Sequence, residues 1–437
     1  MLNRRHFLQF GVAALGTSAL ISTPVFAAGA EAQSVTAVTE VFGDGLRFVA
    51  VAIEYSGPVA AADLVTEDFS VEGRTVTDVY TAISTDPADA ADEGTFVIVA
   101  LSPDDAGASL EIEQERGGPS EDDEEGAGPG GPGGGPGAAG DKTENAEMFN
   151  EPTATVTASG NELTTTAVTN LIVDDFQQFV WNDPETGDTL QYNLYIPKDY
   201  DPAQSYPLVN FMHDAGATST DVLTTLKQGL GAICFASPED QAARPAFVLA
   251  PQYDEIIVDD TSTPSSMMQT TINLITALSD QYSIDPKRRY TTGQSGGGMM
   301  SIAMNIAYPD FFASSFLVAC QWDAALVAPM AGNRIFIVVS QDDAKAFPGQ
   351  VAIAEALEAE GAQVARAVWD ATWTDTQIQF AFDDLIAEGA NINFVTYAEG
   401  TVLDGEAAQG ANGHMNTWKY AYTIPQIRKW LLEGVAR

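Results

Sequence analysis

The chain has 437 residues, of which 61 are Asp or Glu and 19 are Lys or Arg, so its formal net charge is −42. Such an acidic chain lacks the basic surface that nucleic-acid phosphates require, and it lacks the basic patches that hold proteins on anionic membranes. Two cysteines are too few for a disulfide framework or a four-thiolate zinc site. With 45% hydrophobic residues, we expect two or three domains stabilised by ordinary cores.

Residues 1–27 have the pattern of an export signal. Arg4 and Arg5 precede an apolar run over residues 10–21, and residues 25–27 offer a cleavage site, an order that resembles a twin-arginine signal peptide. The run is shorter than the about 20 residues that span a bilayer, and an uncleaved anchor is the alternative. We expect recognition by the twin-arginine export machinery, a periplasmic or extracellular mature protein, and no stable membrane association after cleavage.

The segment 34–174 alternates in the manner of β-strands, and we predict a small antiparallel β-sandwich. The candidate strands cover residues 34–39, 46–53, 95–101, 109–113, 153–157 and 170–173. Between residues 117 and 140 the pattern is interrupted by 11 Gly, 4 Pro and 5 consecutive acidic residues. Such a composition cannot bury enough apolar surface to fold, so we predict a disordered insert, either within the sandwich or as the hinge after it.

From residue 177 to the C-terminus, short apolar runs alternate with helical stretches. The candidate strands cover 208–212, 247–250, 289–292, 316–319, 335–339 and 392–395, and the clearest helices cover 268–282, 298–307 and 352–360. This alternation predicts an α/β fold with a parallel sheet covered on both faces. Ligands bind such sheets at the carboxyl ends of the strands, so functional residues are expected directly after the strands.

The motif with the strongest chemical meaning is Gly293-Gln294-Ser295-Gly296-Gly297, between a predicted strand and a predicted helix. In that context G-x-S-x-G predicts a nucleophile elbow, a tight turn that exposes the hydroxyl of the serine. The N–H of Gly296 then supplies one donor of an oxyanion hole. A flexible Gly-Ser loop is the alternative, but it would not explain the strand and helix on either side.

A serine nucleophile needs a base, and His414 is the only histidine downstream of the elbow. We expect it in a loop before a C-terminal helix that runs to about residue 433. His213, at the end of a predicted strand, is a competing base, although a structural role suits that position better. The acid should follow a strand between serine and base, and Asp343 fits this order. Weaker candidates for the acid are Asp323, the adjacent Asp342 and Asp404.

Residues 192–197, 207–216, 283–297 and 414–418 resemble secreted α/β-hydrolase esterases of the feruloyl-esterase and polyhydroxybutyrate-depolymerase-like group. Some of these esterases carry an N-terminal immunoglobulin-like domain. The resemblance implies an immunoglobulin-like sandwich over 34–174 and an α/β-hydrolase domain over 177–437. It also implies a catalytic triad and an oxyanion hole, formed by Ser295, Asp343 and His414 and by the amides of Ala215 and Gly296.

The chain departs from this family where a strand-end His-Gly is replaced by His213-Asp214. A side chain at position 214 either narrows the oxyanion loop or brings negative charge beside the site. The amides of Asp214 and Ala215 therefore stay alternatives for the second oxyanion donor.

These residues predict a secreted serine esterase that acts on a small-molecule or polymeric ester, requires no cofactor or metal, and has no nucleic-acid partner. A serine peptidase of related fold uses the same machinery and is the nearest alternative. A non-catalytic binding module is a third, which the complete Ser, Asp and His set argues against.

Two pairs of further residues have open roles. Cys234 and Cys320 are expected as separate buried thiols, with a disulfide as the alternative, because their spacing alone does not bring them together. Trp322 and Trp418 either line an acyl or aromatic pocket or pack in the core.

Overall fold

The computed structural model describes residues 31–112, 137–145, 147–403, 405 and 412–436. These residues form two compact units. Of the described residues, the first unit contains 31–41, 45–111 and 149–174, and the second contains all the others. The predicted export signal and most of the predicted insert lie outside the described residues.

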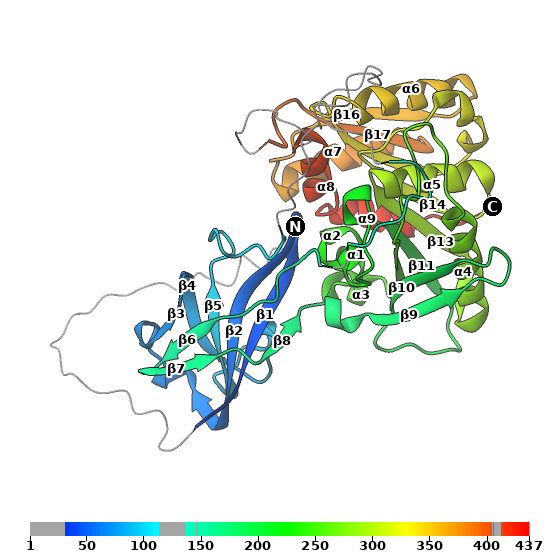
Figure 1. Ribbon diagram of the computed structural model, residues 1–437. Coiled ribbons are helices and arrows are strands. Elements are labelled where there is room, and N and C mark those ends of the chain that lie inside the picture. Colours follow the sequence, from blue (N-terminus) through cyan, green and yellow to red (C-terminus); the bar gives the residue numbers. More distant parts are fainter. Residues whose placement is uncertain (1–30, 113–136, 146, 404, 406–411, 437) are drawn as a thin grey trace, which may run out of the picture. The chain divides into compact units, whose positions relative to one another are not determined.

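The first unit is a β-sandwich, as predicted (Figure 1). Its five-stranded sheet has the order β4-β5-β2-β1-β8, and its three-stranded sheet has the order β3-β6-β7. Val38, Ala52 and Ile98 are completely or almost completely buried in its core. The strands are β1 (Ala32–Phe42), β2 (Gly45–Ala60), β3 (Phe69–Val71), β4 (Val76–Ala82), β5 (Glu93–Leu101), β6 (Thr155–Ala158), β7 (Asn161–Thr164) and β8 (Ala167–Asn170).

Two features of this unit differ from the predicted antiparallel sandwich. Strands β1 and β8 pair in parallel, with Val38 opposite Thr169. The chain reaches β8 through strands of the other sheet and not through a tight hairpin, so the edge pair need not be antiparallel. The strand predicted from residue 109 is also wrong, because the described residues there form only isolated bridges, such as that of Ser109 with Arg47.

Residues 137–145, which we call the arm, belong to the second unit. The amide of Gly140 donates to the carbonyl of Ile256 at 2.8 Å, and the ammonium of Lys142 pairs with the Asp254 carboxylate at 3.1 Å. The disordered insert predicted up to Gly140 is therefore wrong for its last residues, because they already pair with the neighbouring loop.

The second unit is built on a nine-stranded sheet with the order β16-β17-β15-β14-β13-β11-β12-β10-β9. From β16 through β12 in this order, all neighbouring strands pair in parallel. At the other edge, β10 pairs antiparallel with both β12 and β9. The strands are β9 (Gln177–Asn182), β10 (Thr189–Tyr195), β11 (Tyr206–Met212), β12 (Phe247–Gln252), β13 (Ile284–Gln294), β14 (Ser314–Val318), β15 (Ile335–Ser340), β16 (Val364–Trp369) and β17 (Ile392–Tyr397). The predicted α/β fold is confirmed.

Helices cover both faces of this sheet (Figure 1). One face carries α4 (Met267–Gln281), α5 (Gly296–Ala307) and α6 (Ala346–Ala359) over a large hydrophobic cluster of aliphatic and aromatic side chains. The other face is aromatic: Phe316 contacts Tyr422 and Phe336 contacts Trp430, with ring centroids 5.3 and 5.4 Å apart. Burial on both faces explains why the central strands are continuous apolar runs. The helices on the aromatic face are α2 (Leu230–Ala236), α7 (Asp375–Ala387), α8 (Asn412–Ala421) and α9 (Pro425–Leu432).

The C-terminal segment corrects two expectations. The predicted single helix is two helices, because α8 ends at Ala421 and α9 begins at Pro425, a residue suited to the first turn of a helix. His414 lies in the first turn of α8, although a loop was predicted there.

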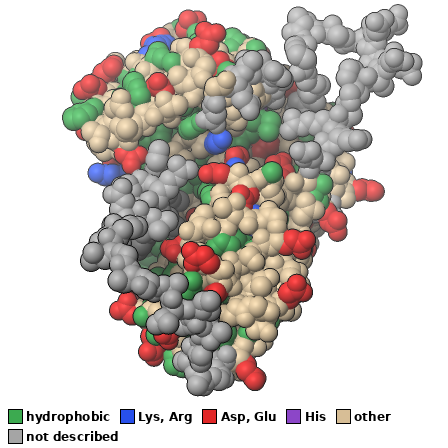
Figure 2. Space-filling view, turned by 90° about the vertical axis from the view of Figure 1, so that its left-hand side faces the viewer, with side chains coloured by type: hydrophobic (Ala, Val, Ile, Leu, Met, Phe, Trp, Pro, Cys, Tyr) green, Lys and Arg blue, Asp and Glu red, His purple; other side chains and the backbone are tan. Residues whose placement is uncertain are grey.

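Acidic side chains are spread over the face drawn in Figure 2, and few basic ones lie among them. This agrees with the excess of Asp and Glu in the sequence. Within the described residues, none of the helices combines the length and the apolar character needed to cross a membrane.

A buried ion pair joins α9 to α3 (Pro238–Ala243). The guanidinium of Arg428 donates to the two carboxylate oxygens of Asp240 at 2.6 and 3.1 Å, and to the carbonyl of Tyr422 at 2.8 Å. The Arg428 and Asp240 side chains are only 4% and 9% exposed, so Arg428 depends on Asp240 for compensation of its charge. Asp240 also pairs with the less buried guanidinium of Arg244, at 3.1 Å.

Replacing Arg428 with Met should lower the free energy of unfolding by about 3 kcal/mol, because the substitution leaves a buried carboxylate with less compensation. Chemical denaturation measures this change. The matched control is Lys429→Met, at the next residue, where an exposed ammonium pairs with Glu433 at 3.8 Å. Exposed pairs contribute less than about 1 kcal/mol, and equal losses for the two variants would contradict the prediction.

Candidate active site

Ser295 lies in a tight turn between β13 and α5, with φ of +47° and ψ of −119°. L-residues rarely adopt this conformation. The turn is tight because two glycines lack side chains. A Cβ on Gly293 would lie 2.4 Å from the carbonyl carbon of Gly297, and a Cβ on Gly297 would lie 1.9 Å from the carbonyl oxygen of Met212. The turn therefore has the geometry expected of a nucleophile elbow.

The structure brings Ser295, His414 and Asp343 together from three separate elements. Nε2 of His414 lies 2.9 Å from Oγ of Ser295, and Nδ1 lies 2.5 Å from Oδ2 of Asp343. The ring of Trp418 packs nearly perpendicular to the imidazole, with centroids 5.1 Å apart. With a proton on Nδ1 facing the carboxylate, Nε2 is left to accept the proton of the serine hydroxyl.

Asp343 is buried, yet its surroundings favour the carboxylate form. Burial raises the pKa of Asp343, but the hydrogen bond and charge interaction with His414 and the backbone N–H groups of Lys345 and Ala346 lower it, with a net pKa below the ordinary 3.8. The two amides donate to Oδ1 at 3.1 and 2.8 Å. Asp343 is therefore charged at neutral pH and suited to stabilise an imidazolium.

The other candidate acids have different surroundings. Asp342 accepts hydrogen bonds from the amide of Gly400 at 2.9 Å and from the hydroxyl of Ser340 at 3.1 Å, so it joins the loops after β15 and β17. Asp323 caps a short helix, and Asp404 lies outside the described residues. Only the second of the two adjacent aspartates is hydrogen bonded to the histidine of the site.

The amides of Ala215 and Gly296 lie close to each other. A Cβ on Gly296 would lie 3.5 Å from the nitrogen of Ala215, which begins a short helical turn after β11. Among the described residues, neither amide has a backbone or side-chain acceptor. Together with the positive end of α5, they suit a developing negative charge. Of the two alternatives for the second donor, Ala215 and not Asp214 is the residue beside Gly296.

His213 has no free nitrogen with which to serve as a base. It is 1% exposed, its Nδ1 lies 2.7 Å from the carbonyl of Asp214, and its Nε2 accepts from the amide of Tyr253 at 3.0 Å. Burial also lowers the pKa of His213. Its role is structural, as its position at the end of a strand suggested.

The loop after β12 forms a wall beside the elbow that sequence reasoning missed. Cγ2 of Val258 would lie 3.8 Å from a Cβ on Gly296. Two residues further on, Asp260 pairs with Lys345 at 2.5 Å, which ties this loop to the one that carries Asp343. A valine and an exposed ion pair belong to no motif, so only the fold reveals that they are neighbours of the site.

Both cysteines are buried and unpaired, which confirms the expectation of separate thiols. Burial raises the pKa of Cys234 to about 12 and also raises the pKa of Cys320, so both are neutral thiols at pH 7. Trp418 contacts His414. Trp322 instead packs in the large hydrophobic cluster beneath α4, α5 and α6.

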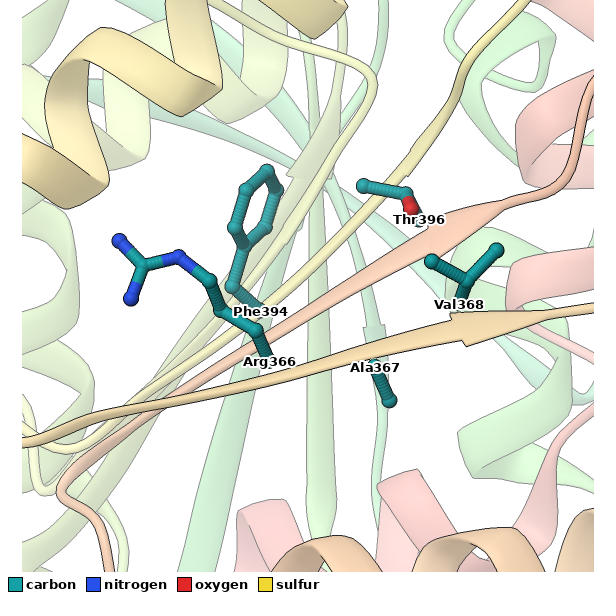
Figure 3. A pocket seen from close by; sticks show the side chains of 5 residues that line it. All are labelled: Arg366, Ala367, Val368, Phe394 and Thr396. Carbon is teal, nitrogen blue, oxygen red and sulfur yellow. The ribbon is translucent and has the colours of Figure 1, made fainter.

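A separate hollow of about 200 Å³ lies on strands β16 and β17 (Figure 3). In Figure 3 the side chain of Ala367 points away from the other four. The residues that line it are Arg366, Ala367, Val368, Phe394 and Thr396. None of them belongs to the triad or the oxyanion amides.

In the part of the chain that is described, no group of three or more His, Cys, Asp or Glu is arranged to hold a metal ion.

Comparisons with known proteins agree with this architecture. Residues 34–169 match the family model described as "Esterase Ig-like N-terminal domain". The crystal structure of a thermostable esterase shares 24% sequence identity with this chain, with a TM-score of 0.71, and the match covers 92% of this chain and 100% of that chain. The first unit thus matches an esterase Ig-like domain family over residues 34–169, and the second unit has an α/β-hydrolase-like fold.

More distant structures are also similar. A feruloyl esterase module from Clostridium thermocellum, complexed with sinapinate, shares 15% identity at a TM-score of 0.41, covering 60% of this chain and 89% of that chain. A ferulic acid esterase from Anaeromyces mucronatus shares 11% identity at a TM-score of 0.36, covering 57% of this chain and 90% of that chain. No curated protein sequence matches the chain.

Replacing Asp343 with Asn should lower kcat by about 10³- to 10⁴-fold, because the imidazole loses its orienting carboxylate and the partner of its cationic form. The adjacent Asp342→Asn is the matched control. It weakens hydrogen bonds that contribute about 1 kcal/mol each, so its loss should stay below about tenfold. Steady-state kinetics of the two variants test this assignment, and a larger loss for Asp342→Asn would reverse it.

Proposed function

We propose that the protein is an exported serine esterase that cleaves carboxylic esters through Ser295, His414 and Asp343. The observation that carries the proposal is the unbroken hydrogen-bond chain from Oδ2 of Asp343 through the imidazole to Oγ of Ser295. The match of the N-terminal part to an esterase domain family supports the same class of reaction.

In the first half of the reaction, Nε2 of His414 takes the hydroxyl proton as Oγ of Ser295 attacks the ester carbonyl carbon. The carbonyl oxygen becomes an oxyanion and accepts hydrogen bonds from the amides of Ala215 and Gly296. The bond between the carbonyl carbon and the alcohol oxygen then breaks. The alcohol leaves with the proton from His414, and the acyl group stays on the serine.

In the second half, water replaces the alcohol. His414 takes a proton from the water, whose oxygen attacks the acyl carbon, and the oxyanion forms again in the same place. Collapse releases the carboxylic acid and returns the proton to Oγ of Ser295. Asp343 stays ionised throughout and stabilises the imidazolium. None of these steps calls for a cofactor or a metal ion.

Hydrolysis of a p-nitrophenyl ester series of increasing acyl length tests the esterase proposal. We expect turnover by the mature protein and a loss of about 10³-fold or more in Ser295→Ala, because the nucleophile is removed. A small-molecule or polymeric ester is the proposed substrate class, and the acyl-length profile measures the size of the acyl site.

Reaction with a fluorophosphonate separates the alternatives. Labelling at Ser295 without ester turnover would favour a serine peptidase of related fold. Absence of both labelling and turnover would favour a non-catalytic binding module and contradict the proposal.

Export is proposed from the sequence of residues 1–27. In a bacterial host with a twin-arginine pathway, the full chain should be found outside the cytoplasm, and the Arg4→Lys/Arg5→Lys variant should stay inside, because paired arginines are the recognised feature. Cell fractionation measures the distribution. Equal export of the two chains would contradict the proposal.

A further inference from the structure

The carboxylate of Asp214 accepts hydrogen bonds from two groups close in sequence to the oxyanion amides. Its Oδ1 accepts a hydrogen bond from the amide of Gly216 at 2.7 Å, and its Oδ2 accepts one from Nε2 of Gln294 at 3.0 Å. The first contact caps the short helical turn that begins with Ala215. The second reaches across to the residue directly before Ser295.

Gln294 is the last residue of β13 and is 1% exposed. Strands β11 and β13 are parallel neighbours, with Met212 opposite Gly293, so the residues after each strand end lie side by side. The hydrogen bond between Gln294 and Asp214 therefore joins the loop that carries one oxyanion amide to the elbow that carries the other.

The carboxylate of Asp214 would oppose an oxyanion if its charge faced the site. Its two oxygens are instead occupied by the N–H groups of Gly216 and Gln294. Hydrogen bonds to an ionised acceptor are stronger than neutral ones and fix geometry better. The same interactions thus stabilise the carboxylate and hold the peptide between Asp214 and Ala215 in place.

We propose that the hydrogen bond between Asp214 and Gln294, which we call the clasp, positions the amide of Ala215 against that of Gly296 and so assembles the oxyanion hole. The inference rests on the proposed serine hydrolase function. Both clasp residues are positioning residues, because they act on the reacting atoms through the two amides.

The clasp should act on the transition state more than on the bound ester, because the two amides make their full hydrogen bonds only when the carbonyl oxygen becomes negative. Its loss should therefore lower kcat and leave KM nearly unchanged. A variant that only destabilises the fold would lower the melting temperature. It would not lower kcat selectively while leaving KM unchanged.

A reciprocal exchange of donor and acceptor tests the clasp. Gln294→Glu places a carboxylate against Asp214 and breaks the hydrogen bond. Asp214→Asn presents an amide donor instead, to which Gln294 can turn its own amide oxygen, so it is the milder of the two single variants. The double variant D214N/Q294E restores one donor and one acceptor. Gln228, whose Oε1 lies 3.3 Å from Nε2 of Gln294, can rotate its buried and unpartnered Nε2 towards the new carboxylate.

We expect kcat for p-nitrophenyl acetate to fall about 10- to 100-fold in Gln294→Glu and by less in Asp214→Asn, with KM within about twofold of the wild type in both. The double variant should recover to within about fivefold of the wild-type kcat, a non-additive result typical of residues in direct contact. The matched control is Asp201→Asn, an exposed carboxylate that accepts from the amide of Ala203 at 2.9 Å and should leave kcat unchanged. Melting temperatures of all variants show that they fold.

The rate of phosphonylation by a fluorophosphonate gives a second readout that needs no ester turnover. In this reaction Oγ of Ser295 bonds to phosphorus, fluoride leaves, the hydroxyl proton passes to His414, and the phosphoryl oxygen occupies the oxyanion hole. The single variants should react more slowly and the double variant should recover.

A Gln294→Glu variant that turns over and reacts as fast as the wild type would overturn the clasp, and so would a double variant no better than Gln294→Glu. A wild-type protein that is phosphonylated but hydrolyses no ester would overturn the ester assignment alone, and the labelling rates would still decide on the clasp. A wild-type protein that does neither would overturn both.

Discussion

The site of the second unit depends on one close approach of backbone to backbone. Helix α5 starts so near β11 that a Cβ on Gly297 would lie 1.9 Å from the carbonyl oxygen of Met212. This approach leaves Ser295 with a φ of +47°, a conformation that costs about 1–3 kcal/mol and persists only where the surroundings impose it. The buried sheet and the helix packed on it impose it here. The serine lies partly exposed at the turn, and the first amide of the helix comes next to Ala215.

Hydrogen bonds between neighbouring loops then fix the groups around the serine. Two adjacent aspartates after β15 have different hydrogen-bond partners and therefore different roles. Asp342 binds the amide of Gly400 and joins two loops, whereas Asp343 binds His414 and receives two amides from the start of α6. A step of one residue along the chain separates a structural carboxylate from one suited to catalysis.

Sequence patterns predicted the centre of the large sheet and missed its edges. The central strands are buried on both faces and read as continuous apolar runs, whereas β16 exposes Arg366 and Val368 and has no such pattern. Strands β9 and β10 were missed as well. The break in the C-terminal helix was missed because helical sequence lies on both sides of the segment before Pro425, although the predicted end near residue 433 agrees with the end of α9 at Leu432.

The site residues divide in the same way. Ser295 has a local motif, and His414 is the only histidine after it, so both were accessible from sequence. Val258 and the contact of Gln294 with Asp214 have no local signature. They become visible only when the strand order puts β11 beside β13. Predicting them from sequence would require the sheet topology first.

The arm belongs to the second unit but lies between two segments of the first unit in the sequence. Residues 137–145 pair with the loop around Ile256, yet strands β6, β7 and β8 of the first unit come after the arm in the sequence. The two units are distinct as folded bodies but interleaved as polypeptide. A single cut before residue 175 would therefore separate the arm from its partners and leave the loop that leads to Val258 with unpaired backbone groups. Residues 42–44 aside, separating the two units would need three cuts, after residues 111, 148 and 174, and two new connections.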